Sequence, residues 1–158
     1  TLTPNLGVVD ADSDNWGESF VAADIPGLID GASDGKGLGH QFLRHLERTK
    51  AIAYVLDGAS FDGTEPADAF AILKQELTSY SPVLASKPAV AVVTKTDVVT
   101  EDFDRHAVRR FLEGQGMEVF FISSVTGEGL DELKRRLAKM AKQAAPESSV
   151  TTENQTNI

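Results

Sequence analysis

The chain has 158 residues, of which 41% are hydrophobic, and it carries a formal net charge of −9 and no cysteine. This length suits one compact domain, and the lack of cysteine excludes disulfides and thiolate metal sites. Binding to nucleic acid needs clustered Lys and Arg, so the acidic balance argues against a direct nucleic-acid patch on this segment. No apolar run approaches the roughly 20 residues of a membrane-spanning helix, so we expect no membrane partner and a cytoplasmic protein.

The first part of the chain predicts a hairpin and then a buried strand. Residues 6–9 and 19–23 have the composition of strands, and the polar, turn-rich segment 10–17 between them is typical of an antiparallel hairpin. Residues 51–56 form a continuous apolar run, and residues 89–93 form another. Such runs favour strands that are buried on both faces of a parallel sheet.

Helices and strands alternate in the rest of the chain. Residues 65–80 place Phe70, Leu73 and Leu77 three and four positions apart, which is the spacing of one helix face. Three further elements are predicted: a helix over 103–113, a strand over 119–122 and a last helix that opens near Gly127. This alternation predicts an α/β fold with a mostly parallel sheet.

The composition changes near Ala145. From there to Ile158 the chain is rich in Ser, Thr, Asn, Gln and Glu, with too few apolar residues to offset the entropy of ordering. The sequence therefore predicts a folded domain over residues 1–145 and a flexible linker or tail over residues 146–158.

Three short polar motifs each follow a predicted strand. Asp24-Ile25-Pro26-Gly27 follows the second strand of the hairpin, and Thr94-Lys95-Thr96-Asp97 follows the run 89–93. Ser123-Ser124-Val125 lies just after the last predicted strand. Because open α/β sheets bind ligands at the carboxyl ends of their strands, these motifs are placed for binding. Each motif alone has a plainer interpretation, since Asp-x-Pro-Gly is commonly a turn and Asp97 could simply cap a helix.

In order and spacing the three motifs resemble the third, fourth and fifth motifs of a Ras-like GTPase. The flanking segments 1–9, 23–33 and 37–49, which read TLTPNLGVV, ADIPGLIDGAS and GLGHQFLRHLERT, look like the GTPase domain of the Obg/CgtA family. The resemblance implies a Ras-like P-loop GTPase fold in three layers, with a mostly parallel sheet and one antiparallel hairpin strand. It also implies hydrolysis of GTP to GDP and phosphate, in large ribosomal subunit assembly and in stress and growth control.

The resemblance also implies roles for individual residues. Asp97 would accept hydrogen bonds from the guanine base, and Lys95 would lay its methylene stem along that base. Leu28 stands where many Ras-like enzymes have a water-orienting glutamine, so no catalytic residue is assigned. The nucleotide-binding residues implied are Asp24, Ile25, Pro26, Gly27, Thr94, Lys95, Asp97, Ser123, Ser124 and Val125, and the Mg²⁺ ligands are Thr1 and Asp24.

One motif of the family is missing. The sequence contains no phosphate loop of the form G-x-x-x-x-G-K-[ST], which in the family would lie upstream of Thr1 with its strand and the first helix. That strand lies in the middle of a Ras-like sheet, between the strands that end at Asp24 and Asp57. Because each unpaired buried backbone group costs about 1–3 kcal/mol, we expect the chain to be part of a longer polypeptide and to be inactive alone.

Two functions therefore stay open. In the first, the chain belongs to a GTPase that contacts the large ribosomal subunit through other domains. In the second, it is a non-catalytic remnant of a guanine nucleotide site that serves as an interaction or scaffold module.

Overall fold

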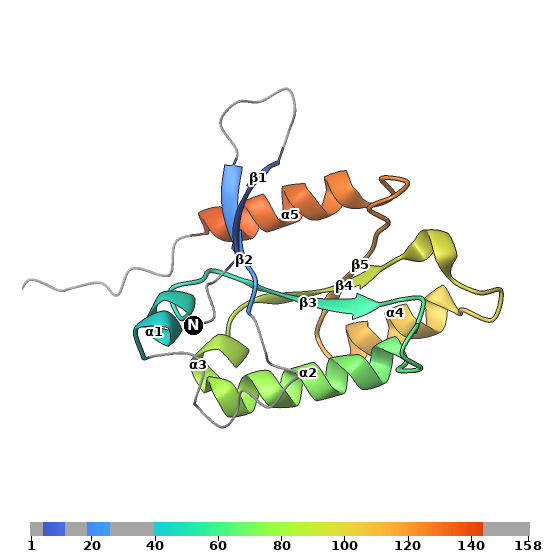
Figure 1. Cartoon of the computed structure of the whole chain (residues 1–158), viewed down its shortest axis with the longest axis horizontal. Helices are drawn as coiled ribbons and strands as arrows, with labels where there is room; N and C mark the ends of the chain where they lie inside the picture. The colour runs from blue at the N-terminus through green and yellow to red at the C-terminus, as the bar shows by residue number, and fades with distance from the viewer. Residues whose placement is uncertain (1–4, 12–18, 26–39, 144–158) are drawn as a thin grey trace, which may run out of the picture.

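The computed structural model of the chain describes residues 5–11, 19–25 and 40–143. Within them, three parallel strands form one sheet with helices on both faces, and a two-stranded hairpin forms a second sheet (Figure 1). The strands are β1 (Leu6–Asp10), β2 (Ser19–Ala23), β3 (Ile52–Asp57), β4 (Ala89–Thr94) and β5 (Glu118–Phe121). The helices are α1 (His40–Leu46), α2 (Pro66–Tyr80), α3 (Pro82–Ala85), the short 3₁₀ helix η2 (Thr96–Val98), α4 (Arg105–Gly114) and α5 (Leu130–Lys142).

The predicted strands and the three long helices are confirmed, with ends that differ by at most three residues from the sequence pattern. The sequence analysis did not predict α1, α3 or η2. The last helix begins at Leu130 and not near Gly127, because Gly127 and Gly129 both adopt positive φ angles, of 84° and 70°. None of the helices within the described ranges is long and apolar enough to span a bilayer.

Each long helix begins with residues that suit a helix N-terminus. Pro66 occupies the first turn of α2, where a missing N–H is tolerated. The Asp104 carboxylate accepts a hydrogen bond of 3.0 Å from the Ala107 amide and so caps α4. In α5, Asp131 and Glu132 lie in the first turn and Lys139 and Lys142 in the last. Charges in this order interact favourably with the helix dipole.

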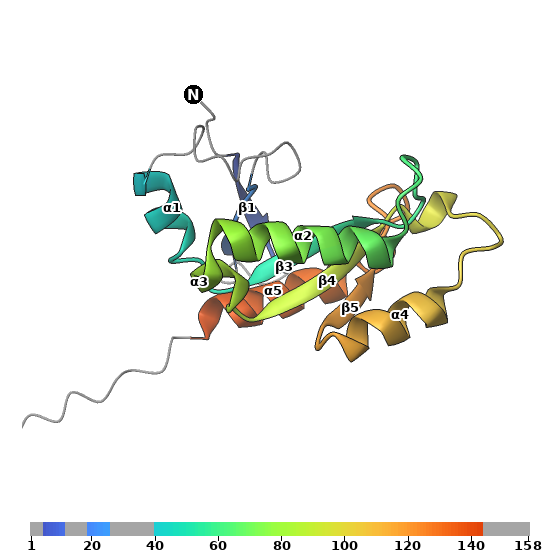
Figure 2. The same ribbon diagram turned by 90° about the horizontal axis from the view of Figure 1, so that it is seen from below.

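The central strand of the parallel sheet, β4, is the most buried. The side chains of Val90, Ala91, Val92 and Val93 are at most 2% exposed, because helices cover both faces of this strand (Figures 1 and 2). On one face Tyr54 of β3 meets Phe70 of α2 edge to face, with ring centroids 5.1 Å apart. On the other face β4 packs against α5 through Leu133 and Met140.

The hairpin lies apart from the parallel sheet. β1 pairs antiparallel with β2, with Val8 opposite Val21, which confirms the predicted hairpin. Figure 1 shows the two strands running across the direction of β3, and within the described residues β2 and β3 share no hydrogen-bonded ladder. β3 is therefore an edge strand of the described part of the parallel sheet.

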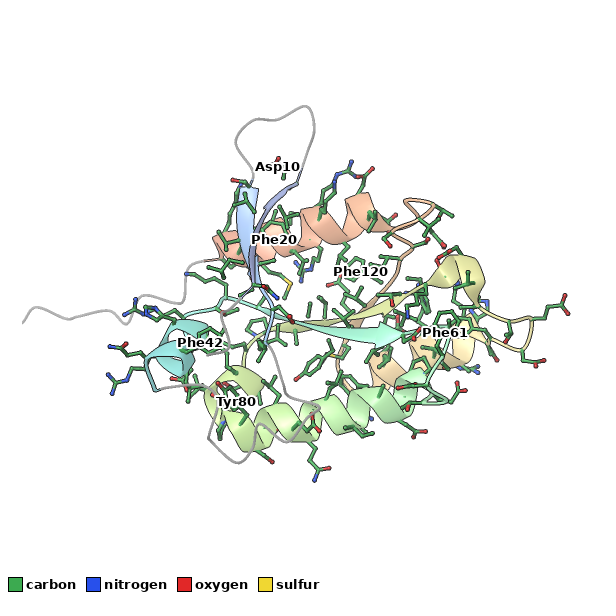
Figure 3. The ribbon with its side chains drawn as sticks, in the orientation of Figure 1. Asp10, Phe20, Phe42, Phe61, Tyr80 and Phe120 are labelled. Atoms are coloured by element: carbon green, nitrogen blue, oxygen red, sulfur yellow. The ribbon has the colours of Figure 1, made fainter. Side chains whose placement is uncertain are left out.

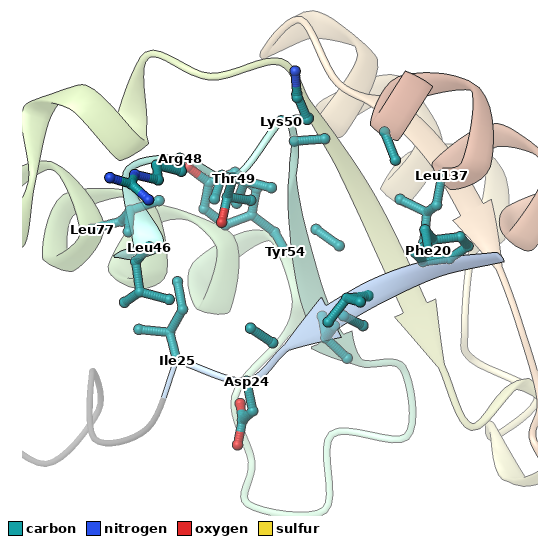
Figure 4. A pocket seen from close by; sticks show the side chains of 18 of the residues that line it. Phe20, Asp24, Ile25, Leu46, Arg48, Thr49, Lys50, Tyr54, Leu77 and Leu137 are labelled. Carbon is teal, nitrogen blue, oxygen red and sulfur yellow. The ribbon is translucent and has the colours of Figure 1, made fainter. Parts of the chain in front are cut away.

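A large cavity of about 960 Å³ lies between the hairpin and the parallel sheet (Figure 4). Its wall is formed by β2, β3, the segment 48–51 and side chains of α2 and α5. Beside it, Val55 is 60% exposed, whereas its register partner Val92 on the same face of β4 is 2% exposed. The α5 layer thus covers β4 but not β3, so the predicted burial on both faces is confirmed for β4 and is wrong for β3 within the described residues.

We expect Gly129→Ala to lower the free energy of unfolding by more than Gly127→Ala. Both glycines have positive φ, which costs an L-residue about 1–2 kcal/mol. Only at Gly129 would a new Cβ collide with a backbone atom, the carbonyl oxygen of Phe121, whereas the space at Gly127 is open. Urea unfolding followed by circular dichroism measures the difference, and equal losses for the two variants would contradict this account.

Candidate functional site

The segments after β4 and β5 lie against each other at the carboxyl edge of the sheet. The Ile122 amide donates to the carbonyl of Val93 at 2.8 Å, and the Thr96 amide donates to the carbonyl of Ile122 at 3.3 Å. These bonds continue the pairing of β4 with β5 beyond the strands themselves. Two of the predicted motifs, 94–97 and 123–125, therefore meet in one place.

Ser123 joins the two motifs through its side chain. Its hydroxyl donates to Oδ1 of Asp97 at 2.7 Å and accepts from the amides of Val125 and Thr126 at 3.2 and 3.1 Å. Ser123 is fully buried, whereas Asp97 is exposed. A buried hydroxyl with three partners has little freedom, so it holds the Asp97 carboxylate in one orientation at the surface.

Lys95 has an unusual backbone and two side-chain contacts. Its φ of 60° and ψ of 35° lie in the left-handed region, which is rare for a residue other than glycine. Its ammonium group lies 3.0 Å from Oδ2 of Asp57 and 4.6 Å from the centroid of the Phe61 ring. Phe61 itself is 71% exposed and lies beyond the carboxyl end of β3 (Figure 3).

The carboxylate of Asp57 binds the ammonium group of Lys95. Partial desolvation raises the pKa of this carboxyl, but hydrogen bonds from Lys95 and from the Ala59 amide outweigh that effect, and the pKa lies below its usual value. The sequence analysis missed Asp57 and Phe61 as site residues. A signal for Asp57 was present, because this aspartate follows a predicted strand in the same way as Asp24.

Close packing brings the segment after β3 onto the motif after β4. The Gly58 amide donates to the Thr94 carbonyl at 3.0 Å, and a Cβ at Gly58 would lie 2.5 Å from that same oxygen. Thr94 donates its hydroxyl to the carbonyl of Leu56 at 3.2 Å. Thr94 therefore serves the contact between β3 and β4, and glycine is needed at position 58 for the close approach.

The remaining predicted motif, residues 24–27, begins directly after the second strand of the hairpin. Asp24 is exposed just beyond β2, where its amide donates to the Asn5 carbonyl at 2.9 Å, and it borders the cavity (Figure 4). Ile25 is partly buried against the main core. Thr1, Pro26 and Gly27 lie outside the described residues, as do Leu28 and the predicted tail 146–158, so those expectations stay predictions.

The residues present are compatible with Mg²⁺. In the described ranges, no group of three or more His, Cys, Asp or Glu side chains is clustered for a metal ion. Mg²⁺ keeps several waters and takes one or two carboxylates together with substrate phosphates, so an all-protein cage is not required. The exposed carboxylate of Asp24 at a strand end therefore fits a magnesium ion that is completed by phosphate oxygens and water.

A parallel sheet with helices on both faces and polar motifs at its carboxyl edge defines an α/β protein with a candidate ligand site at the ends of its strands. A family model described as 50S ribosome-binding GTPase matches residues 1–95. A second model, described as ethanolamine utilisation - propanediol utilisation, matches residues 63–139.

Comparison with individual relatives identifies the group of GTPases more closely. The GTPase Obg of Alkaliphilus oremlandii is 48% identical over 143 residues, an alignment that covers 90% of this chain and 33% of that protein. The GTPase Obg of Aquifex aeolicus is 45% identical over 139 residues, which cover 88% of this chain and 40% of that protein. The chain belongs to the 50S ribosome-binding GTPase family, and within it to the Obg/CgtA GTPases. It spans between 33% and 40% of the length of these two relatives.

Solved structures share the fold. The cytosolic domain of the Thermotoga maritima FeoB iron transporter matches with a TM-score of 0.54 at 23% identity, covering 89% of this chain and 51% of that one. The nucleolar GTP-binding protein 1 of Plasmodium falciparum matches with a TM-score of 0.57 at 17% identity, covering 87% and 69%. At these identities the likeness concerns the fold alone, and it confirms the predicted fold class.

We expect Ser123→Ala to destabilise the protein by about 1–3 kcal/mol, since the change removes the three hydrogen bonds that its buried hydroxyl makes to Asp97 and to the amides of Val125 and Thr126. Its neighbour Ser124 is exposed, so Ser124→Ala is the matched control and should change the free energy of unfolding by less than about 0.5 kcal/mol. Urea unfolding of both variants measures the difference. Equal stability of the two would show that the Ser123 hydroxyl has no such role.

Proposed function

We propose that this chain supplies the base-reading part of a guanine nucleotide site in an enzyme that hydrolyses GTP to GDP and phosphate. The observation that carries the proposal is the exposed Asp97 carboxylate held by the buried Ser123 hydroxyl, at 2.7 Å, at the carboxyl edge of the sheet. The family membership of the chain supports the same function.

The geometry suits recognition of guanine. A fixed carboxylate can accept two hydrogen bonds, from N1–H and from the exocyclic amine, and adenine cannot offer that pair. A ligand that leaves such a carboxylate unpaired is rejected by about 10⁴-fold or more. Lys95 is the proposed cover of the base, with its aliphatic stem against the ring and its ammonium group toward Asp57.

The backbone amides of the motif 123–125 differ in whether they are free to bind a ligand. The Ser123 amide already donates to the Glu128 carbonyl at 3.0 Å, and the Val125 amide donates to the Ser123 hydroxyl at 3.2 Å. Both are therefore engaged inside the protein. We assign the proposed contact with guanine O6 to the amide of Ser124, whose side chain is exposed.

At the phosphate end, Asp24 is the proposed protein ligand of Mg²⁺, with Thr1 as a second ligand in the triphosphate state. Bound Mg²⁺ would neutralise charge on the phosphates. Ile25, Pro26 and Gly27 would follow the phosphates with their backbone, and Gly27 would donate its amide to the γ-phosphate.

The uncovered edge of β3 supports a role within a longer fold. Val55 is 60% exposed although its register partner Val92 is buried, and the 960 Å³ cavity lies beside this strand. Isolated apolar exposure in a parallel strand is unfavourable, because such strands are buried on both faces in α/β folds. We propose that the strand of a phosphate loop pairs with β3 here and that the helix after it covers Val55.

Hydrogen exchange tests this assignment. The Ile52 amide donates to Pro88 and the Gly58 amide to Thr94, so even-numbered amides of β3 point to β4 and odd-numbered amides point away. In this 158-residue chain the amides of Ala53 and Val55 should exchange much faster than those of Tyr54 and Leu56. They should become protected when a phosphate-loop segment of an Obg GTPase is supplied, and protection of all four amides in the chain alone would contradict the proposal.

Nucleotide binding separates the enzyme from the scaffold alternative. With the phosphate-loop segment present, Asp97→Asn should weaken GDP binding by about 10²-fold or more and favour xanthosine diphosphate, because an amide can donate to the xanthine 2-oxygen. Ser124→Ala, which keeps the backbone amide, is the control and should bind GDP like the wild type. A well-folded protein that binds neither nucleotide would support the scaffold function.

The wider biological role is also a proposal. Membership of the 50S ribosome-binding GTPase family supports action in large ribosomal subunit assembly, and the Obg resemblance implies a part in growth and stress control. With a net charge of −9, this segment is poorly suited to bind RNA phosphates, so ribosome contact would come from other domains. A cytoplasmic location agrees with the absence of cysteine.

A further inference from the structure

A single carboxylate connects the base-reading segment to its neighbours. Oε2 of Glu128 accepts a hydrogen bond of 2.5 Å from the Thr96 hydroxyl, and Oε1 accepts one of 2.7 Å from Nη1 of Arg105. Thr96 is 8% exposed and stands directly before Asp97. Glu128 therefore ties the residue next to the proposed base-reading carboxylate to the first residue of α4.

The backbone of Glu128 is itself fixed. Its carbonyl accepts from the Ser123 amide at 3.0 Å, and its amide donates to the Thr126 hydroxyl at 3.3 Å. The next residue, Gly129, approaches the Phe121 carbonyl so closely that no side chain fits. The carboxylate of Glu128 thus projects from a rigid turn and not from a loose loop.

Arg105 is also restrained. Its guanidinium carbon lies 4.9 Å from the centroid of the Phe121 ring, within the range of a cation–π contact. The Asp104 cap fixes the first turn of α4 to which Arg105 belongs. The hydrogen bonds from Arg105 and Thr96 lower the pKa of Glu128 below its usual value, so this carboxyl stays ionised at neutral pH.

We propose that Glu128 is a positioning residue for guanine specificity, which acts on Asp97 from two directions. Its carboxylate holds Thr96 on one side of Asp97, and its carbonyl holds the amide of Ser123, whose hydroxyl binds Asp97 on the other side. Arg105 keeps the carboxylate of Glu128 in place. This inference rests on the proposed function, because it concerns the same guanine site.

The chain offers a matched control for a merely structural ion pair. Arg136 of α5 and Glu118 of β5 form a pair whose length is also 2.7 Å, with side chains 36% and 50% exposed. The Arg105 and Glu128 side chains are 43% and 41% exposed. Within the described residues the Glu118 side chain bonds to Arg136 and to neither motif, so its removal tests the general effect of losing a surface ion pair.

The experiment compares GDP with inosine diphosphate, which lacks only the exocyclic amine that Asp97 would bind. Dissociation constants are measured by titration calorimetry on the full protein with its phosphate loop, for wild type, Glu128→Ala, Glu128→Gln, Thr96→Val and Glu118→Ala. Glu128→Ala should lower the preference for GDP over inosine diphosphate by about two- to tenfold, the factor expected for one misaligned hydrogen bond. Thr96→Val should cause a similar loss, and Glu128→Gln should restore part of the preference because its amide oxygen can still accept from Thr96.

The outcomes distinguish this inference from the function on which it rests. Glu118→Ala should keep the wild-type preference. If Glu128→Ala and Thr96→Val also keep it, the positioning role is wrong while the guanine site stands. If the wild type prefers neither nucleotide, the proposed guanine site fails and the positioning role fails with it. Should Glu128→Ala fold poorly, Thr96→Val decides alone, since it removes one buried hydroxyl and leaves the carboxylate paired with Arg105.

Discussion

The parallel pairing of β4 with β5 is the constraint on which the site depends. The ladder runs from Val90 to Val93 opposite residues 118–121, and it brings two chain segments to the same edge of the sheet. Ser123 and Asp97 lie just beyond that ladder, and their 2.7 Å hydrogen bond exists only because both strands end at the same level. A slip in register between β4 and β5 would move Ser123 away from Asp97 and break this contact.

Backbone strain and close packing both occur at the carboxyl edge of the parallel sheet. Lys95 has a left-handed backbone, which costs about 1–3 kcal/mol and persists only where surrounding contacts fix it. Those contacts are the ion pair with Asp57, the ring of Phe61 and the close packing of Gly58 on Thr94. These contacts restrain the proposed base-reading end, which would favour specificity because less conformational entropy is lost on binding.

The two ends of the proposed nucleotide site differ in how they are built. At the base end, β4 and β5 are paired, Ser123 is buried and hydrogen bonds cross between the motifs. At the other end, Asp24 lies on a hairpin that shares no ladder with β3 within the described residues, and Val55 is exposed beside a cavity. The physical difference is that β4 and β5 support the base end, whereas β3 has an unpaired edge and an uncovered face within the described residues, where we propose a further strand and helix.

The sequence by itself determined the local elements, the alternation that predicts a parallel sheet, and the polar motifs at the strand ends, because these follow from short-range periodicity and turn chemistry. It also indicated that motifs 94–97 and 123–125 lie on one edge. It did not predict the pairs of Lys95 with Asp57 and of Thr96 with Glu128, whose members are 38 and 32 residues apart. Nor did it predict the crossing of the hairpin over β3. Only the tertiary structure decided these contacts, because side-chain direction and hairpin orientation depend on packing between distant segments, which no local pattern encodes.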